Sequence, residues 1–170
     1  DTIEGTMSIG GTTFRFIDTA GLRETQDVVE QMGIERTVEQ LRKTSIALWI
    51  VDPAADYAQM EITAKKILPE CKDKKLAILI NKSDTIREER LAEVMEWGKT
   101  LVAECGEDIV WSQDDMWAIS ARLRSNLDRL EEFLVRSAAL PAISSGDVVV
   151  TNVRHYEALT RALKEIKEVK

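Results

Sequence analysis

Apolar residues in this chain of 170 residues follow two patterns, short uninterrupted runs and longer polar segments interspersed with apolar positions. The runs at residues 45–51 and 76–80 are almost entirely apolar, as expected for strands of a parallel sheet covered on both faces. Apolar residues spaced three to four positions apart are typical of helices with one buried face. We expect helices at residues 34–43, 57–71, 87–105, 127–135 and 152–169.

Further strands are expected on either side of these segments. Residues 6–9 and 12–17 should form a β-hairpin, because Gly10 and Gly11 between them can adopt the positive φ angles of a two-residue turn. Residues 1–5 would then end the preceding loop, and residues 116–120 would form the last strand. Strands and helices alternate from residue 45 onward, which predicts an α/β fold with a mostly parallel sheet and flanking helices.

Composition limits the number of domains and the cellular setting. With 44% hydrophobic and 31% charged residues, the chain is long enough for one well-buried domain and too short for two large ones. The two cysteines fit a reducing cytoplasm better than a disulfide framework. No apolar run approaches the roughly 20 residues that span a bilayer, so we expect a cytoplasmic protein without membrane contact.

The domain boundaries follow from a change in composition near the end of the chain. We expect the main domain at residues 1–140. A linker at residues 141–150 is indicated by the Ser, Gly and Pro residues there. The helix expected within residues 151–170 has no partner of its own in this sequence, so we assign it to an adjoining helical domain.

Short polar segments directly follow three of the predicted strands. Because α/β folds bind ligands at the carboxyl ends of their strands, three such segments in succession suit a nucleotide site. They are Asp18, Thr19, Ala20 and Gly21 after residues 13–17, Asn81, Lys82, Ser83 and Asp84 after residues 76–80, and Ser120 and Ala121 after residues 116–119.

The first segment suits a metal ion and a phosphate. The carboxylate of Asp18 can hold Mg²⁺ through water, and Gly21 lets a backbone N–H approach a phosphate without an intervening side chain. Taken alone, Asp-x-x-Gly is also an ordinary strand-to-turn sequence, so the order of the later segments decides the interpretation.

The second segment suits a guanine base. The carboxylate of Asp84 can accept two N–H groups from the guanine edge, and Asn81 offers the base both a donor and an acceptor. The stem of Lys82 can lie across the purine plane. A solvated turn is the alternative for this segment, whereas Ser120 and Ala121 are expected to contribute mainly backbone.

Taken in order, the three segments resemble the switch II, N-K-x-D and guanine-loop motifs of Ras-like GTPases. DTAGLRE at residues 18–24, followed by an acidic and apolar segment and GIER at residues 33–36, is similar to switch II of the tRNA-modification GTPases of the MnmE type, also called TrmE. TNVRHYEAL at residues 151–159 is similar to the segment by which that family returns from its G domain to its helical domain. The resemblance covers nearly the whole chain and implies a Ras-like P-loop GTPase fold.

The resemblance also implies a function. The full protein would hydrolyse GTP with Mg²⁺, dimerise through its G domains with help from K⁺, and work with a flavin-bearing partner, GidA or MnmG, to modify the wobble uridine of certain tRNAs. The net charge of −7 and the pI near 4.9 argue against a nucleic-acid-binding surface on this chain. We therefore expect other domains to hold the tRNA.

One catalytic residue is implied as well. In this family a glutamate of the acidic segment positions the attacking water, and the register from Asp18 falls on Glu30. The alternative is that Glu24, Asp27 and Glu30 are solvated charges of a mobile loop.

The sequence contains no Gly-x-x-x-x-Gly-Lys-Ser/Thr loop to hold phosphates and no strand before it. It thus resembles a G domain that starts at the tail of switch I, and alone it is expected to bind GTP very weakly and to be inactive. In a Ras-like sheet the absent first strand lies between the strands that end at Asp18 and Asp52.

That position cannot stay empty, because each buried backbone group without a partner costs about 1–3 kcal/mol. The two strands could pair directly, the hairpin could detach, or another chain could donate a strand. We favour a first strand that lies outside this sequence or comes from a second copy.

Two alternative functions remain open. One is a non-catalytic interaction module that binds a partner through its sheet edge and its last helix. The other is a different Ras-like GTPase, such as a ribosome-assembly factor, although those proteins lack the string from GLRE to GIER and continue into an RNA-binding domain.

Overall fold

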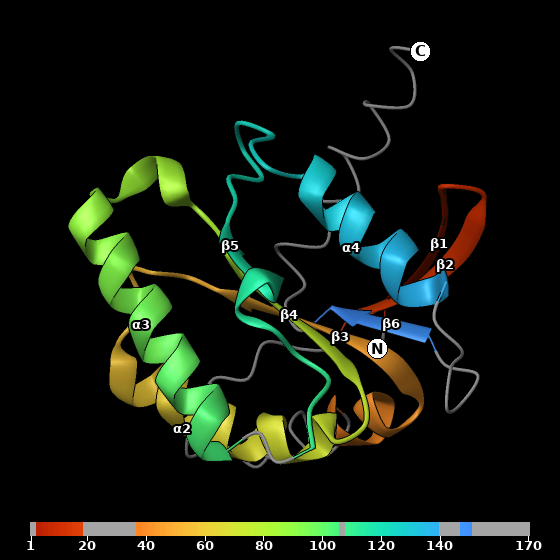
Figure 1. The fold of residues 1–170 in the computed structure, drawn as a ribbon, viewed down its shortest axis with the longest axis horizontal. Coiled ribbons are helices and arrows are strands. Elements are labelled where there is room, and N and C mark those ends of the chain that lie inside the picture. Colours follow the sequence, from red (N-terminus) through yellow and green to blue (C-terminus); the bar gives the residue numbers. More distant parts are fainter. Residues whose placement is uncertain (1–2, 19–36, 106–107, 140–146, 151–170) are drawn as a thin grey trace.

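The computed structural model describes residues 3–18, 37–105, 108–139 and 147–150. Six strands form one sheet in the order β1-β2-β6-β3-β4-β5, antiparallel between β1 and β2 and parallel elsewhere (Figure 1). The strands are β1 (Ile3–Ile9), β2 (Thr12–Asp18), β3 (Thr44–Val51), β4 (Lys75–Ile80), β5 (Met116–Ala118) and β6 (Asp147–Val150). The helices are α2 (Tyr57–Ile67), α3 (Glu88–Cys105) and α4 (Asp128–Ala139), with further helical residues at 37–42.

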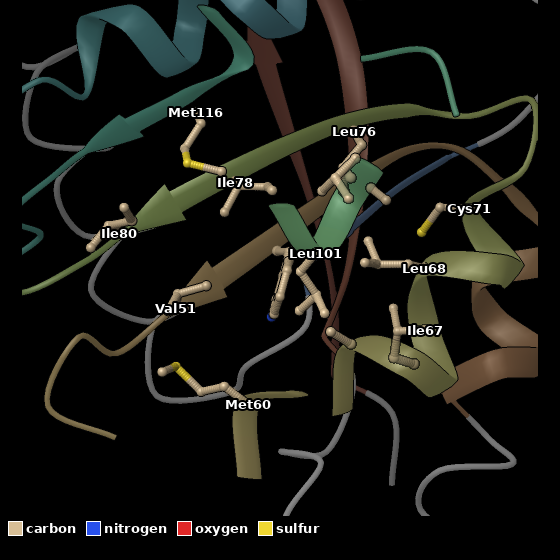
Figure 2. Close-up of a cluster of buried hydrophobic side chains, with 14 of the residues drawn as sticks. Val51, Met60, Ile67, Leu68, Cys71, Leu76, Ile78, Ile80, Leu101 and Met116 are labelled. Carbon is tan, nitrogen blue, oxygen red and sulfur yellow. The ribbon is translucent and has the colours of Figure 1, made fainter. Parts of the chain in front are cut away.

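Both faces of the central strands are buried, because alternate side chains of a strand point to opposite faces. On one face Leu48 and Leu79 share a hydrophobic cluster with Phe133 of α4. On the other face, shown in Figure 2, Ile78 clusters with Met60 of α2, with Leu101 of α3 and with further residues of β3 and β4. The expected α/β sheet with flanking helices is therefore confirmed, as are the strands expected at residues 45–51 and 76–80.

The hairpin expected at the start of the chain is present, with a turn at Gly10 and Gly11. Their φ angles are +56° and +80°, the left-handed region that glycine adopts without steric cost. The expected loop at residues 1–5 is wrong for its later part, because β1 begins at Ile3 and pairs that residue with Asp18. Extending β1 gives the end of β2 a hydrogen-bonding partner on this side.

Two other expected elements end earlier than predicted. The helix expected at residues 57–71 becomes α2 followed by a 3₁₀ turn, Leu68–Cys71, because Pro69 has no N–H with which to continue the helix. The strand expected at residues 116–120 ends at Ala118, and Ser120 instead bonds across a loop to Ser125. Among the described residues, no helix is long and apolar enough to cross a membrane.

The sheet position between β2 and β3 is occupied by the chain's own residues. β6 pairs in parallel with Phe16–Asp18 on one side and with four residues of β3 on the other. Our preference for a strand from elsewhere is therefore wrong for this structure, and the last four residues of the expected linker at 141–150 are a strand. The physical reason is the one that excluded an empty position: exposed rows of N–H and C=O groups pair with whatever extended segment can reach them.

Candidate functional site

Two loops meet at the carboxyl edge of the sheet, one after β4 and one after β5. These strands are parallel neighbours, so their ends lie at the same edge. Backbone hydrogen bonds continue the pairing into the loops, from Ile119 N to Ile80 O at 2.8 Å and from Ser83 N to Ile119 O at 3.1 Å. The loops are therefore held at a fixed separation by the sheet itself.

Asn81 joins the two loops from within. Its side chain is buried at 3% exposure, and its Oδ1 accepts the backbone N–H of Lys82 at 2.8 Å and that of Ala121 at 3.1 Å. Its own backbone N–H donates to Val51 O at the end of β3, at 2.9 Å. Through its side chain and its backbone, this one residue ties together the ends of three strands, which is a positioning role that the sequence analysis did not assign to Asn81.

Asp84 lies beside the second loop and is held by two of its side chains. Ser120 Oγ donates to Oδ1 at 2.5 Å, while Arg122 donates to Oδ2 from Nε at 3.1 Å and from Nη2 at 2.7 Å. The hydrogen bond from Ser120, and then those from Arg122, lower the pKa of Asp84 from its ordinary value. The carboxylate is therefore kept ionised and fixed in orientation, as an acceptor for N–H groups has to be.

Lys82 is held by the end of the neighbouring strand. Its φ of 60° is in the left-handed region that few non-glycine residues adopt, and its Nζ lies 2.5 Å from Asp52 Oδ2. Asp52 follows β3 directly and also accepts the backbone N–H of Ala54 at 3.0 Å. The sequence analysis missed Asp52, although its place after a buried strand matches that of Asn81 after β4.

The structure brings together five of the residues predicted for this site. They are Asn81, Lys82, Asp84, Ser120 and Ala121. The hydroxyl of Ser120 is engaged as well, because its Oγ also accepts the N–H of Leu123 at 3.1 Å, so the expectation of a mainly backbone role was too narrow. The contact of Arg122 with Asp84 was not predicted: Arg122 stands where the resembled family usually has Lys or Thr, and that departure was not expected to change the base.

The remaining predicted residues lie at or beyond the edge of what the structure describes. Asp18 is the last residue of β2, and its backbone pairs with Ile3 and Val150. Since β2 runs parallel to β6, β3, β4 and β5, Asp18 ends at the same edge of the sheet as the two loops. Thr19, Ala20, Gly21 and Glu30 fall outside the described residues. Within the described ranges, no cluster of three or more His, Cys, Asp or Glu side chains forms a metal site.

Comparison of the sequence with known proteins also points to a GTPase. The sequence model of the family described as "50S ribosome-binding GTPase" matches residues 1–82. A protein from Bacteroides fragilis named tRNA modification GTPase MnmE is 46% identical over 169 residues, which cover 99% of this chain and 35% of the relative. The proteins of the same name from Bacteroides thetaiotaomicron and Christiangramia forsetii are 43% and 37% identical, again over 99% of this chain. The chain spans about a third of the length of the curated relatives it matches.

A solved structure shares the fold. Translation elongation factor SelB from Methanococcus maripaludis, in complex with the GTP analogue GPPNHP, superimposes with a TM-score of 0.63 over 85% of this chain and 29% of its own. The sequence identity of 15% limits this likeness to the fold. The aligned relatives show that the chain belongs to the MnmE-type GTPases, of whose GTPase domain it is a part.

Proposed function

We propose that this chain supplies the guanine-recognising part of a domain that hydrolyses GTP, in a protein that modifies tRNA. The observation that carries the proposal is the junction of the two loops, in which Asn81 fixes Ala121 and Ser120 orients Asp84. Relatives named tRNA modification GTPase align along 99% of the chain, whereas the match to the ribosome-binding family stops at Lys82. We therefore favour tRNA modification over ribosome assembly.

The base would be recognised by hydrogen bonds and by contact with its ring. Guanine carries N–H groups on N1 and on the exocyclic N2, and an ionised carboxylate such as Asp84 can accept both. The tether from Asp52 to Lys82 limits where the lysine stem can lie, which favours contact with one purine face. Adenine lacks the N1–H, so the same carboxylate discriminates against it.

The phosphates would lie toward the end of β2. A carboxylate oxygen is the ligand type that Mg²⁺ prefers, and the position of Asp18 at the carboxyl edge fits a magnesium ligand on that side. Thr19, Ala20 and Gly21 would follow the phosphates as switch II. When bound, the metal would neutralise charge that develops on the transferred phosphate.

Glu30 would position the attacking water. The proposal rests on the register of the sequence between DTAGLRE and GIER. In a full-length protein that contains this sequence, Glu30→Ala should lower the rate of GTP hydrolysis about a hundredfold, the size expected when an orienting or acid–base group is lost. Nucleotide affinity should change little. Glu24→Ala is the matched control, and equal losses from both variants would mean that the acidic segment acts only through its charge.

The wider assembly follows from the family. We propose that K⁺ aids dimerisation of the G domains, that a flavoprotein of the GidA or MnmG type is the partner, and that other domains hold the tRNA. Measuring the oligomeric state of the full-length protein with GDP and a transition-state analogue, in KCl and in NaCl, tests the first point. A dimer that forms equally well in both salts would contradict it.

Guanine recognition can be tested on the 170-residue chain itself. Titration with GDP and ADP, followed by the backbone amide signals of Asn81 and Ala121, should show weak binding of GDP alone. Asp84→Ala should weaken GDP binding about tenfold or more, because charge-assisted hydrogen bonds are lost. Asp108→Ala, which removes an exposed carboxylate paired with Lys72, is the control and should change nothing.

The same chain should hydrolyse GTP negligibly, because it contains no phosphate-binding P-loop sequence. Turnover measured on the purified chain tests this expectation. A rate comparable to that of a full-length relative would contradict it and would point to phosphate contacts that neither the motifs nor the described residues contain.

A further inference from the structure

The carboxylate that should receive guanine is already engaged within the chain. From the side chains of other residues, Asp84 Oδ1 accepts one hydrogen bond, donated by Ser120, and Oδ2 accepts two, both donated by Arg122. The two partners differ in their surroundings. Ser120 is buried at 1% exposure, whereas the side chain of Arg122 is 74% exposed and that of Asp84 is 9% exposed.

Counting lone pairs shows a conflict at one oxygen. A carboxylate offers about four acceptor sites, two on each oxygen. Ser120 leaves one free on Oδ1, but the two N–H groups of Arg122 fill Oδ2. Guanine brings two parallel N–H groups, from N1 and N2, and needs one site on each oxygen. Guanine and Arg122 therefore compete for Oδ2, while guanine and Ser120 can bind together.

We propose that Arg122 is a displaceable cap on Asp84, which occupies the guanine acceptor in the empty site and must release Oδ2 when the base binds. This inference rests on the proposed guanine site and adds a determinant of its affinity. The exposed Arg122 side chain can swing into solvent at little cost, since surface ion pairs contribute little and are screened by salt. The lowered pKa of Asp84 fits a carboxylate that stays charged and ready to accept the base.

The test compares two nucleotides that differ by one amino group. GMP has the N2 amino group and IMP lacks it, and both carry the same phosphate and the same N1–H. Because IMP can use the free site on Oδ1, the cap should hinder it less. In the 170-residue chain, Arg122→Ala should raise GMP affinity by about two- to fivefold, the range expected for an exposed ion pair. The ratio of GMP affinity to IMP affinity should rise with it.

Salt and two further variants separate the cap from a general charge effect. The gain from Arg122→Ala should shrink between 50 and 500 mM NaCl, concentrations chosen because screening weakens the ion pair at the upper one. Arg122→Lys, which keeps the charge but not the paired N–H groups, should give a smaller gain. Arg42→Ala is the matched control, because Arg42 makes a comparable two-bond ion pair with Glu70 away from the site, with distances of 3.0 and 3.2 Å. It should leave both affinities unchanged.

Several results would contradict the proposal that Arg122 caps Asp84. Weaker GMP binding by Arg122→Ala would mean that Arg122 contacts the base, and an unchanged ratio of GMP to IMP affinity would mean that it does not compete for Oδ2. An equal gain from Arg42→Ala would mean that the gain does not arise from freeing Asp84. If neither the wild-type chain nor Arg122→Ala responded to GMP at Asn81 and Ala121, the guanine site itself would be refuted, and the cap with it.

Discussion

The two sides of β3 are paired in different ways. On one side, β4 pairs with β3 in unbroken register from Ile46 to Val51, opposite Lys75 to Ile80. On the other side, the short strand β6 pairs with only four residues of β3, and its register shifts between Thr44 and Ile46. The last three residues of β3 thus extend past the registered pairs with β6, while their pairs with β4 continue to the loops of the candidate site.

The difference separates two sources of structural specificity. The β3–β4 side is defined by side chains, since alternate residues of both strands are buried against helices on both faces. The β6 side follows from the need of exposed backbone groups for partners, and that need can be met by many extended segments. We therefore expect the β3–β4 side to be rigid, with a stability that depends on its side chains. The stability of the β6 side should depend mainly on its backbone hydrogen bonds.

The largest effect should be seen at Cys71, which lies in the cluster beneath β4 (Figure 2). Burial raises the pKa of its thiol from an ordinary 9.0 to about 12, so at pH 8 about a thousandfold less thiolate forms. Labelling by a thiol reagent should be slower by at least that factor in the folded chain than in denaturant. Labelling at similar rates would show that this side of the sheet opens readily.

The same shift has a consequence for stability at high pH. The thiol is neutral in the folded chain up to about pH 12, whereas in the unfolded chain it ionises near pH 9.0. The unfolded state then binds fewer protons, so this group lowers the free energy of unfolding as pH rises through that window. When the pH is raised from 9 to 10.5, the urea concentration at the midpoint of unfolding should fall less for Cys71→Ala than for the wild-type chain.

Shortening a buried side chain in β4 should lower the free energy of unfolding substantially. Leu79 is fully buried, so Leu79→Ala should lower the free energy of unfolding by about 2–5 kcal/mol. Leu123 is 60% exposed in the loop after β5, and Leu123→Ala should change it by less than about 0.5 kcal/mol. Urea denaturation of both variants measures the contrast. Equal effects would mean that the two clusters do not hold the sheet.

A backbone change in β6 tests the other side. Val149→Pro removes an N–H from a strand paired on both sides and should cost about 1–3 kcal/mol. Val149→Thr keeps the N–H and the branched side chain, so it should cost less. If both variants unfold like the wild-type chain, β6 contributes nothing to stability. The claim that backbone pairing holds this side of β3 would then be wrong.

The smallest contrast concerns the turn of the β1–β2 hairpin. A Cβ at Gly10 would lie 2.6 Å from Val135 Cγ2 of α4, whereas a Cβ at Gly11 would have no atom within 4 Å. Both alanine variants carry the strain of a positive φ, and Gly10→Ala adds an overpacking cost of about 1–2 kcal/mol. Adding Val135→Ala should remove that difference. If it persists, the hairpin does not rest on α4.

The sequence by itself determined the elements whose signals are local. The apolar runs predicted β3 and β4, because a residue's own hydrophobicity reports its burial. Gly10 and Gly11 predicted the hairpin turn, because few other residues adopt their φ angles. Asn81, Lys82 and Asp84 indicated the guanine site because their order and chemistry are specific, and the structure brings them together with Ser120 and Ala121.

Only the tertiary structure decided which distant residues became partners. Asp52 and Lys82 are thirty positions apart and Asp84 and Arg122 thirty-eight, and each pair meets because parallel strands end at one edge of the sheet. β6 lies in the segment expected as a linker, and its valine run at residues 148–150 was a local strand signal that the Ser, Gly and Pro residues before it obscured. Its place in the sheet depends on backbone groups of β2 and β3 left unpaired elsewhere in the fold, and no local stretch of sequence carries that information.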